Sequence, residues 1–192
     1  WEKMKNFNNI DERVVDDLKK ELKAQSKLKI AAASFSIYAY EELKKELEKV
    51  DQIQFLFTSD LFTKEKAPKE KREFFIPRLN RESQLYGNEF ELRMRNELSQ
   101  KAIAKEAAEW IRQKVTFKSN ISGQRSDNFM VVENKGNINV YAPFDEFTTA
   151  EIGTTKGEKL FYNISKFENE NTQQFLNAFE QVWHNQDYVD EV

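Results

Sequence analysis

The chain has 192 residues, of which 33% are charged and 39% are hydrophobic, a balance typical of a folded domain with a well-solvated surface. It contains no cysteine, which excludes disulfide frameworks, thiolate zinc sites and cysteine nucleophiles. No run approaches the roughly 18 apolar residues of a membrane span, and the charged start has no apolar signal segment behind it. We therefore expect a cytoplasmic protein with no membrane partner.

The length predicts a single domain over residues 1–192, and the start at Trp1 rather than Met leads us to expect a fragment of a longer protein. The net charge of −3 hides a basic middle and an acidic end. Residues 168–192 contain no Lys or Arg and six acids, so they predict an acidic terminal helix and tail. The basic residues of the middle are Lys64, Lys66, Lys69, Lys71, Arg72, Arg78 and Arg81.

The first part of the chain predicts a helix, a strand, a second helix and a second strand. Residues 11–25 place four apolar side chains on one helix face, with Asp11 as the N-cap. Residues 28–36 form a short apolar run, apolar residues recur at helical spacing over 40–50, and 53–58 are rich in aromatic side chains. Strand, helix and strand in this order predict a parallel pair joined by a crossover.

The middle of the chain predicts a long excursion followed by helices. Residues 58–83 hold two of the three prolines and no sustained apolar period, and their basic part is 64–83. Residues 88–113 have no Gly or Pro and show helical spacing, which predicts two consecutive helices. A short strand is expected at 115–118.

The last part predicts a hairpin and a terminal helix. Residues 129–133 are apolar at four successive positions, as in a central strand, and a compact turn joins them to a strand at 138–142. A helical repeat then follows at Phe175, Phe179 and Val182. The complete pattern predicts an α/β fold with a mixed β-sheet flanked by helices on both faces.

Few residues suggest catalysis. The single histidine, His184, excludes a two-histidine metal site and argues against a Ser/His triad, and no phosphate-binding glycine motif occurs. Asp145 and Glu146 form an acidic pair in an apolar neighbourhood without metal-ligand spacing, so we interpret them as a loop feature. We expect neither a metal nor another cofactor.

The basic cluster offers the one nucleic-acid hypothesis. Several cations can neutralise phosphates, and Phe74, Phe75 and Tyr86 lie close by for base stacking. The same cluster is also explained as a solvated face. Further cations that could help follow in the predicted helices: Arg93, Arg95, Lys101 and Lys105.

Four segments, taken in order, resemble a known family. They are KIAAASFSIYAYEELKKELEKV with QIQFLFTS, LSQKAIAKEAAEWIRQKVTFKSN, NFMVVENKGNINVYAPFDEFTTAEIG and FLNAFEQVWHN. Together they are similar to the phospholipase D-like domain at the N-terminus of bacterial Swi/Snf-type, superfamily-two helicases. The match spans most of residues 9–186. The resemblance implies a mixed sheet flanked by helices, a longer parent protein whose helicase motor lies downstream of Val192 and is a partner of this domain, and a homodimer as one mode of assembly.

Active members of that superfamily carry the motif HxKxxxxD, whose histidine attacks phosphorus and whose lysine stabilises the charged oxygens. The resemblance places Val131 at the histidine position, Glu133 at the lysine position and Ile138 at the aspartate position. Valine has no nucleophilic atom, and a carboxylate repels a phosphodiester. The resemblance therefore implies a phospholipase D-like scaffold with a degenerate motif.

Three functions remain open from the sequence. The first is a non-catalytic module that contacts nucleic acid or a partner domain for a helicase. The second is a phosphodiesterase or nuclease with a substitute site, in which Asp145 and Glu146 hold a metal ion. The third is an interaction domain that binds no nucleic acid.

Overall fold

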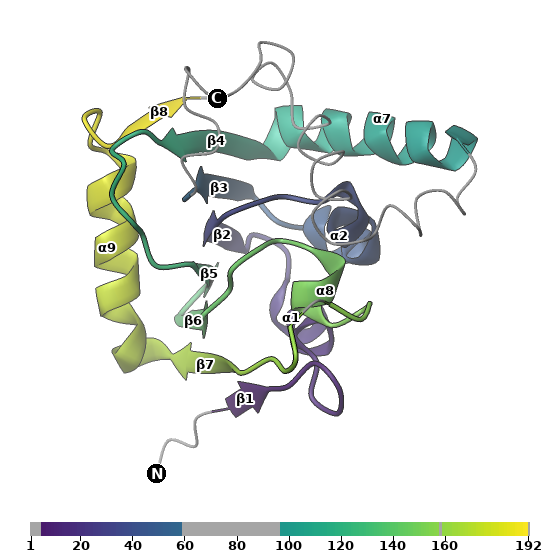
Figure 1. Cartoon of the computed structure of the whole chain (residues 1–192), viewed down its shortest axis with the longest axis horizontal. Helices are drawn as coiled ribbons and strands as arrows, with labels where there is room; N and C mark the ends of the chain where they lie inside the picture. Colours follow the sequence, from purple (N-terminus) through teal and green to yellow (C-terminus); the bar gives the residue numbers. More distant parts are fainter. Residues whose placement is uncertain (1–4, 59–96, 158, 192) are drawn as a thin grey trace.

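The computed structural model describes residues 5–58, 97–157 and 159–191. Within these ranges the strands form one sheet of eight, in the order β1-β7-β6-β5-β2-β3-β4-β8 (Figure 1). Strands β2, β3 and β4 run parallel to one another, and the remaining neighbours pair antiparallel. The sheet is thus mixed, and the predicted α/β class is confirmed. The strands are β1 Lys5–Phe7, β2 Lys27–Ala32, β3 Gln52–Phe57, β4 Val115–Asn120, β5 Phe129–Asn134, β6 Asn137–Ala142, β7 Ile164–Glu168 and β8 Val189–Glu191.

Helices cover both faces of this sheet (Figure 1). On one face α9 packs over a small core that includes Val131, Val140 and Trp183. On the other face lies a larger core to which α1, α2, α3 and α7 contribute, with Phe35 and Phe55 in edge-to-face contact at its centre. The helices are α1 Val14–Glu21, α2 Ile37–Glu42, α3 Lys44–Leu47, α7 Glu97–Lys114, α8 Thr149–Ile152, the 3-10 turn η2 Asn169–Thr172 and α9 Gln173–Trp183.

The central strands lie where the sequence predicts them, although β2 is shorter than the apolar run at 28–36. It ends at Ala32 because the following backbone pairs with the loop after β6. There the amide of Ala33 donates to the carbonyl of Asp145, and the amide of Ser36 donates to the carbonyl of Phe147. The hairpin between β5 and β6 is confirmed, and Gly136 in its turn has the positive φ of 85° that favours glycine.

Two helix predictions differ from the structure, and a third falls only partly within the described residues. Asp11 does not cap α1, which begins at Val14, where the Asn9 side chain accepts from the Val14 amide instead. The helix expected over 40–50 is divided into α2 and α3, because Leu43 leaves the helical dihedral angles. The described part of 88–113 belongs to one helix, α7, and the earlier part lies outside the described residues. In the described ranges no helix combines the length and the apolar character needed to cross a membrane.

Candidate functional site

Polar side chains meet at the edge of the sheet where the parallel strands end. Thr58 follows β3, and its hydroxyl donates to Asn128 at 2.5 Å. The side-chain amide of Asn128, just before β5, donates to the carboxylate of Asp145, after β6, at 3.4 Å. The side-chain amide of Asn120, at the end of β4, donates to the carbonyl of Thr58 at 3.4 Å. Open α/β sheets bind ligands outside the carboxyl ends of their strands, so this edge is the candidate site.

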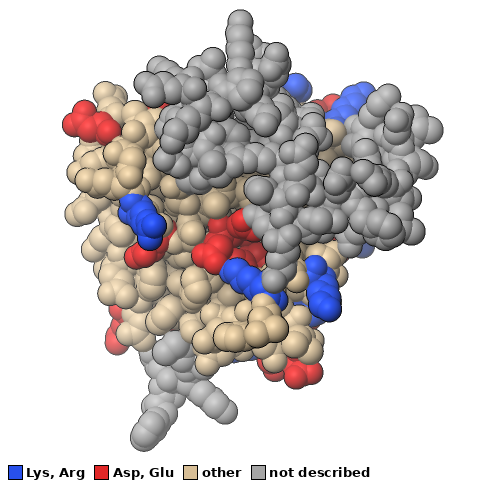
Figure 2. Space-filling model, viewed as in Figure 1, with Lys and Arg blue, Asp and Glu red and all other residues tan. Residues whose placement is uncertain are grey.

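A charged cluster forms one side of this edge. Glu151, in the first turn of α8, accepts a 2.9 Å hydrogen bond from the amide of Asp145. Lys159 bridges the two acids, with its Nζ atom 2.5 Å from Asp145 Oδ2 and 3.4 Å from Glu151 Oε1. Figure 2 shows acidic and basic side chains next to each other near the middle of the viewed face.

Burial governs the protonation of this cluster. The Glu151 side chain is almost fully buried, and burial raises its pKa although Lys159 favours the charged form. Burial lowers the pKa of Lys159, but the hydrogen bond to Asp145 and the charge of Glu151 outweigh it, so that its pKa is raised overall. The lysine therefore stays charged and neutralises much of the negative potential of the two carboxylates.

Of the predicted acidic pair, Asp145 and Glu146, only Asp145 belongs to this cluster. Glu146 lies beside it: burial raises the pKa of Tyr162, and the charges of Glu151 and Glu146 raise it further. Across residues 5–58, 97–157 and 159–191, no group of three or more His, Asp or Glu side chains could hold a metal ion. The ammonium of Lys159 lies between the carboxylates of Asp145 and Glu151.

The three degenerate motif positions lie on the opposite side of the molecule from α8, on the sheet face covered by α9. Val131 is fully buried in the small core, and Ile138 packs against the same core. Glu133 is the cross-strand partner of Ile138, and its carboxylate forms an ion pair with Lys29 on β2 at 2.7 Å. The structure thus brings the three positions together, but beneath a helix and in mainly apolar packing.

His184 caps the C-terminal end of α9 and is exposed. Its Nε2 atom lies 2.9 Å from Glu180 Oε2, and the other oxygen of Glu180 pairs with Lys29 at 2.9 Å. The histidine is therefore connected to Glu133 through Lys29, and lies at the end of a surface ion-pair network rather than in a cleft.

The predicted nucleic-acid contacts are for the most part outside the described residues. This holds for all seven basic residues between 64 and 81, for Arg93 and Arg95, and for the side chain of Lys101. Lys105 is described, and it is exposed on α7. The carboxyl edge of the sheet is connected to the basic segment by the chain itself, since residues 59–63 join Thr58 to Lys64.

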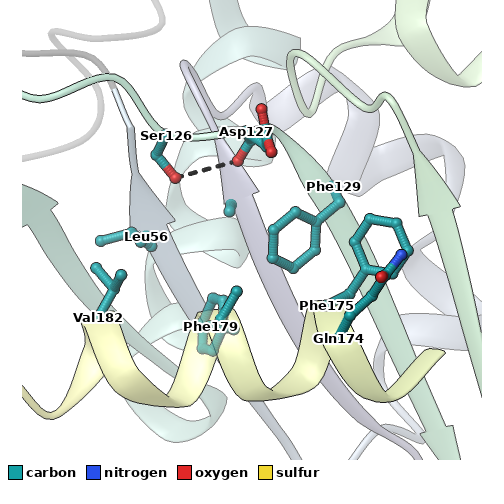
Figure 3. Close-up of a pocket in the computed structure, with 10 residues that line it drawn as sticks. Leu56, Ser126, Asp127, Phe129, Gln174, Phe175, Phe179 and Val182 are labelled. Carbon is teal, nitrogen blue, oxygen red and sulfur yellow. Dashed lines mark hydrogen bonds between the residues drawn. The ribbon is translucent and has the colours of Figure 1, made fainter.

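A hollow lies between α9 and the sheet, with a volume of about 340 Å³. Figure 3 shows Phe175, Phe179 and Val182 of α9 facing Leu56 and Phe129 of the sheet. Ser126 and Asp127 form its polar end, where the hydroxyl of Ser126 donates to the Asp127 carbonyl at 3.2 Å. The remaining lining residues are Ala31, Gln174 and Ala178.

Sequence reasoning missed Thr58, Asn128, Glu151 and Lys159 as site residues. Two of them carried a usable signal, because Thr58 ends one predicted strand and Asn128 directly precedes another. Polar residues at strand ends are the ones that meet at a sheet edge. Glu151 and Lys159 carried no such signal, since their contact with Asp145 depends on how the α8 loop returns to the sheet. The chain matches no protein-family model and no curated protein.

Proposed function

We propose that this chain is a non-catalytic phospholipase D-like module of a helicase-type protein, which binds nucleic acid or a partner domain. The observation that carries the proposal is the burial of Val131 within apolar packing. A nucleophile at this position would lie under α9, out of reach of a phosphodiester, and valine provides none.

A different register of the same motif leads to the same conclusion. If Glu133 stands at the aspartate position, the spacing of HxKxxxxD assigns Ser126 to the histidine and Asn128 to the lysine. Both residues lie at the carboxyl edge, which suits a former active site. Asn128 is uncharged and bonded to Thr58, and Ser126 donates to the Asp127 carbonyl. In neither register do imidazole and ammonium occupy the motif.

The charge of the edge also disfavours phosphodiester chemistry. Asp145 and Glu151 lie there with Lys159 already paired to both, so a phosphate would meet carboxylates where an active site needs free cations. This arrangement favours a scaffold function. The metal-dependent alternative would need further acids beside Asp145, for which the described residues offer no cluster.

A turnover assay tests the proposal. Purified protein is incubated with bis(4-nitrophenyl) phosphate and with single-stranded DNA, each with and without Mg²⁺ or Mn²⁺. We expect no turnover above buffer. Turnover that disappears in the His184→Ala variant would show histidine-dependent catalysis and would contradict the proposal. Metal-dependent turnover that disappears in Asp145→Asn would instead support the carboxylate alternative.

A further inference from the structure

We propose that Asp145, Glu151 and Tyr162 form a binding site for an arginine or lysine side chain of a partner polypeptide, and that Lys159 occupies this site as an internal stand-in. The inference goes beyond the proposed function, because it depends neither on the phospholipase D-like motif nor on nucleic acid. We call these three residues the cation site.

The contacts of Lys159 define the chemistry of the cation site. Its ammonium lies 2.5 Å from Asp145 Oδ2 and 3.4 Å from Glu151 Oε1, and 5.2 Å from the ring centroid of Tyr162. Lys159 is thus surrounded by two carboxylates and the face of an aromatic ring. These groups stabilise an organic cation that has lost its water shell.

Two of the three walls of the cation site, Glu151 and Tyr162, have contacts that do not involve Lys159. Glu151 is fixed by α8, where its amide donates to Thr148 Oγ1 at 3.2 Å, and by its bond to the Asp145 amide. Tyr162 packs against the larger core. Its hydroxyl lies so close to Gly157 that a Cβ atom there would be 1.9 Å away. These two walls are therefore preorganised, which lowers the entropic cost of binding.

Glu151 also has an acceptor that Lys159 does not satisfy. Its Oε2 atom is buried and has no hydrogen-bond partner, although the whole residue is only 3% exposed. Buried carboxylate oxygens are rarely left in this state. A guanidinium presents five donors in a planar fork, where an ammonium acts as a point charge. The unpaired oxygen thus favours arginine over lysine as the incoming side chain.

The segment that carries Lys159 is weakly packed. The Lys159 side chain is 46% exposed, and the next two residues, Leu160 and Phe161, are 96% and 73% exposed. Displacing Lys159 therefore uncovers little apolar surface. Two exposed apolar side chains next to a cation site can add contacts to a polypeptide, whereas a small amine gains less from them. This is why we assign the ligand to a protein partner.

The first experiment uses the side-chain analogues methylguanidinium and butylammonium at constant ionic strength. Amide chemical shifts of Asp145, Glu151 and Tyr162 are followed in the wild-type protein, in Lys159→Gln and in Lys156→Gln. Lys156 is an exposed lysine in the same loop that is absent from the cation site, so its variant is the matched control. We expect saturable shifts in Lys159→Gln, with methylguanidinium bound more tightly. Binding should be at least about tenfold weaker in the other two proteins, because the tethered ammonium competes at high effective concentration.

Equal affinity of all three proteins, or no saturable shift in a folded Lys159→Gln protein, would overturn the proposal. Lys159→Ala is the second opened variant if Lys159→Gln does not give a folded amide spectrum. Adding Glu151→Gln to the opened variant should abolish the shifts, since it removes the buried charge while keeping the side-chain shape. Binding that survives this change would also overturn the assignment.

A second experiment separates a polypeptide from a polyamine as the source of the cation. The acetylated, amidated tripeptide Leu-Arg-Leu and spermidine are titrated into Lys159→Gln and into the same variant carrying Phe161→Ser. We expect the peptide to bind more tightly than methylguanidinium and to lose several-fold in affinity with Phe161→Ser. Tighter binding of spermidine, independent of Phe161, would contradict a protein partner.

Discussion

Tyr141 on β6 donates its phenolic hydrogen to Asp17 Oδ2 on α1 over 2.5 Å, and both side chains are buried. Lys166 on β7 lies 3.0 Å from the same oxygen, and Lys5 on β1 lies 3.2 Å from the other one. One carboxylate thereby connects α1 to three strands at one end of the sheet. Charged groups removed from water in this way depend strongly on their partners.

The hydroxyl of Tyr141 should contribute measurably to stability. Replacing Tyr141 with Phe removes one hydrogen bond to a buried charge, which is worth about 1.5–3 kcal/mol in the free energy of unfolding. Urea denaturation at neutral pH measures the loss. Tyr188→Phe is the control, because Tyr188 is 38% exposed and the change should cost at most about 0.5 kcal/mol. A loss for Tyr141→Phe no larger than for the control would contradict the role of this bond.

The stability contributed by Asp17 should depend on pH. Burial raises the pKa of Asp17, but hydrogen bonds from Tyr141 and Lys166 outweigh it, so the pKa lies below its usual value. A carboxyl with a lowered folded pKa stabilises the fold above the unfolded pKa of about 3.9, and this stabilisation is lost as pH falls through the folded pKa. Asp17→Asn should therefore cost about 3 kcal/mol at pH 7 and clearly less at pH 3.

The free energy of unfolding of wild type and of Asp17→Asn, measured at several pH values from about 3 to about 7, checks this prediction. Asp16→Asn is the neighbouring control, since Asp16 is exposed and pairs with the exposed Arg13. Its difference from wild type should stay small throughout. A penalty for Asp17→Asn that does not change with pH would show that the carboxylate charge is not the stabilising feature.

Gly157 should not tolerate a side chain. The added methyl of Gly157→Ala would lie 1.9 Å from the Tyr162 hydroxyl and 2.9 Å from Ala150 Cβ, and such overpacking costs about 1–3 kcal/mol. Thermal or urea unfolding measures this cost. Removing the hydroxyl in Gly157→Ala with Tyr162→Phe should recover part of it, as a coupling of at least about 0.5 kcal/mol. Strict additivity of the two changes would mean that the hydroxyl is not what excludes the methyl group.

The central strands were predictable because their burial is local and apolar. Residues 129–133 show this most clearly, since they are apolar on both faces and become the middle of the sheet. Strand β7 was not predictable for a physical reason. Its Lys166 is 5% exposed, and it is buried only because Asp17 and Glu21 approach from α1. A lysine in the sequence gives no sign of such distant partners.

The short strands β1 and β8 were missed for a related reason. Each has three residues with one buried side chain, Phe7 or Val189, which gives no alternating pattern to detect. The candidate site shows the same limit. Asp145 could be singled out because it forms an acidic pair with Glu146 in an apolar neighbourhood, whereas its contact with Lys159 is created by the return of the chain from α8 to β7.

Any nucleic-acid contact should run through the basic segment at 64–81, which follows β3 in the chain. The described carboxyl edge is acidic and the net charge is −3, so no general attraction for nucleic acid exists and binding should be local and weak. Neutralising Lys69, Lys71 and Arg72 together should lower affinity for single-stranded DNA. The logarithmic salt slope should become flatter, by roughly 0.7 for each phosphate contact that is lost.

Titrations with single-stranded DNA at two salt concentrations measure both quantities. The control neutralises Asp187, Asp190 and Glu191 in the acidic tail, which should leave the salt slope nearly unchanged, because these residues make no phosphate contacts. If the triple substitution changes neither affinity nor slope, the basic segment is not the binding surface. Docking of a partner domain then becomes the better account of the module, and the cation site at Asp145 and Glu151 is the place to look for it.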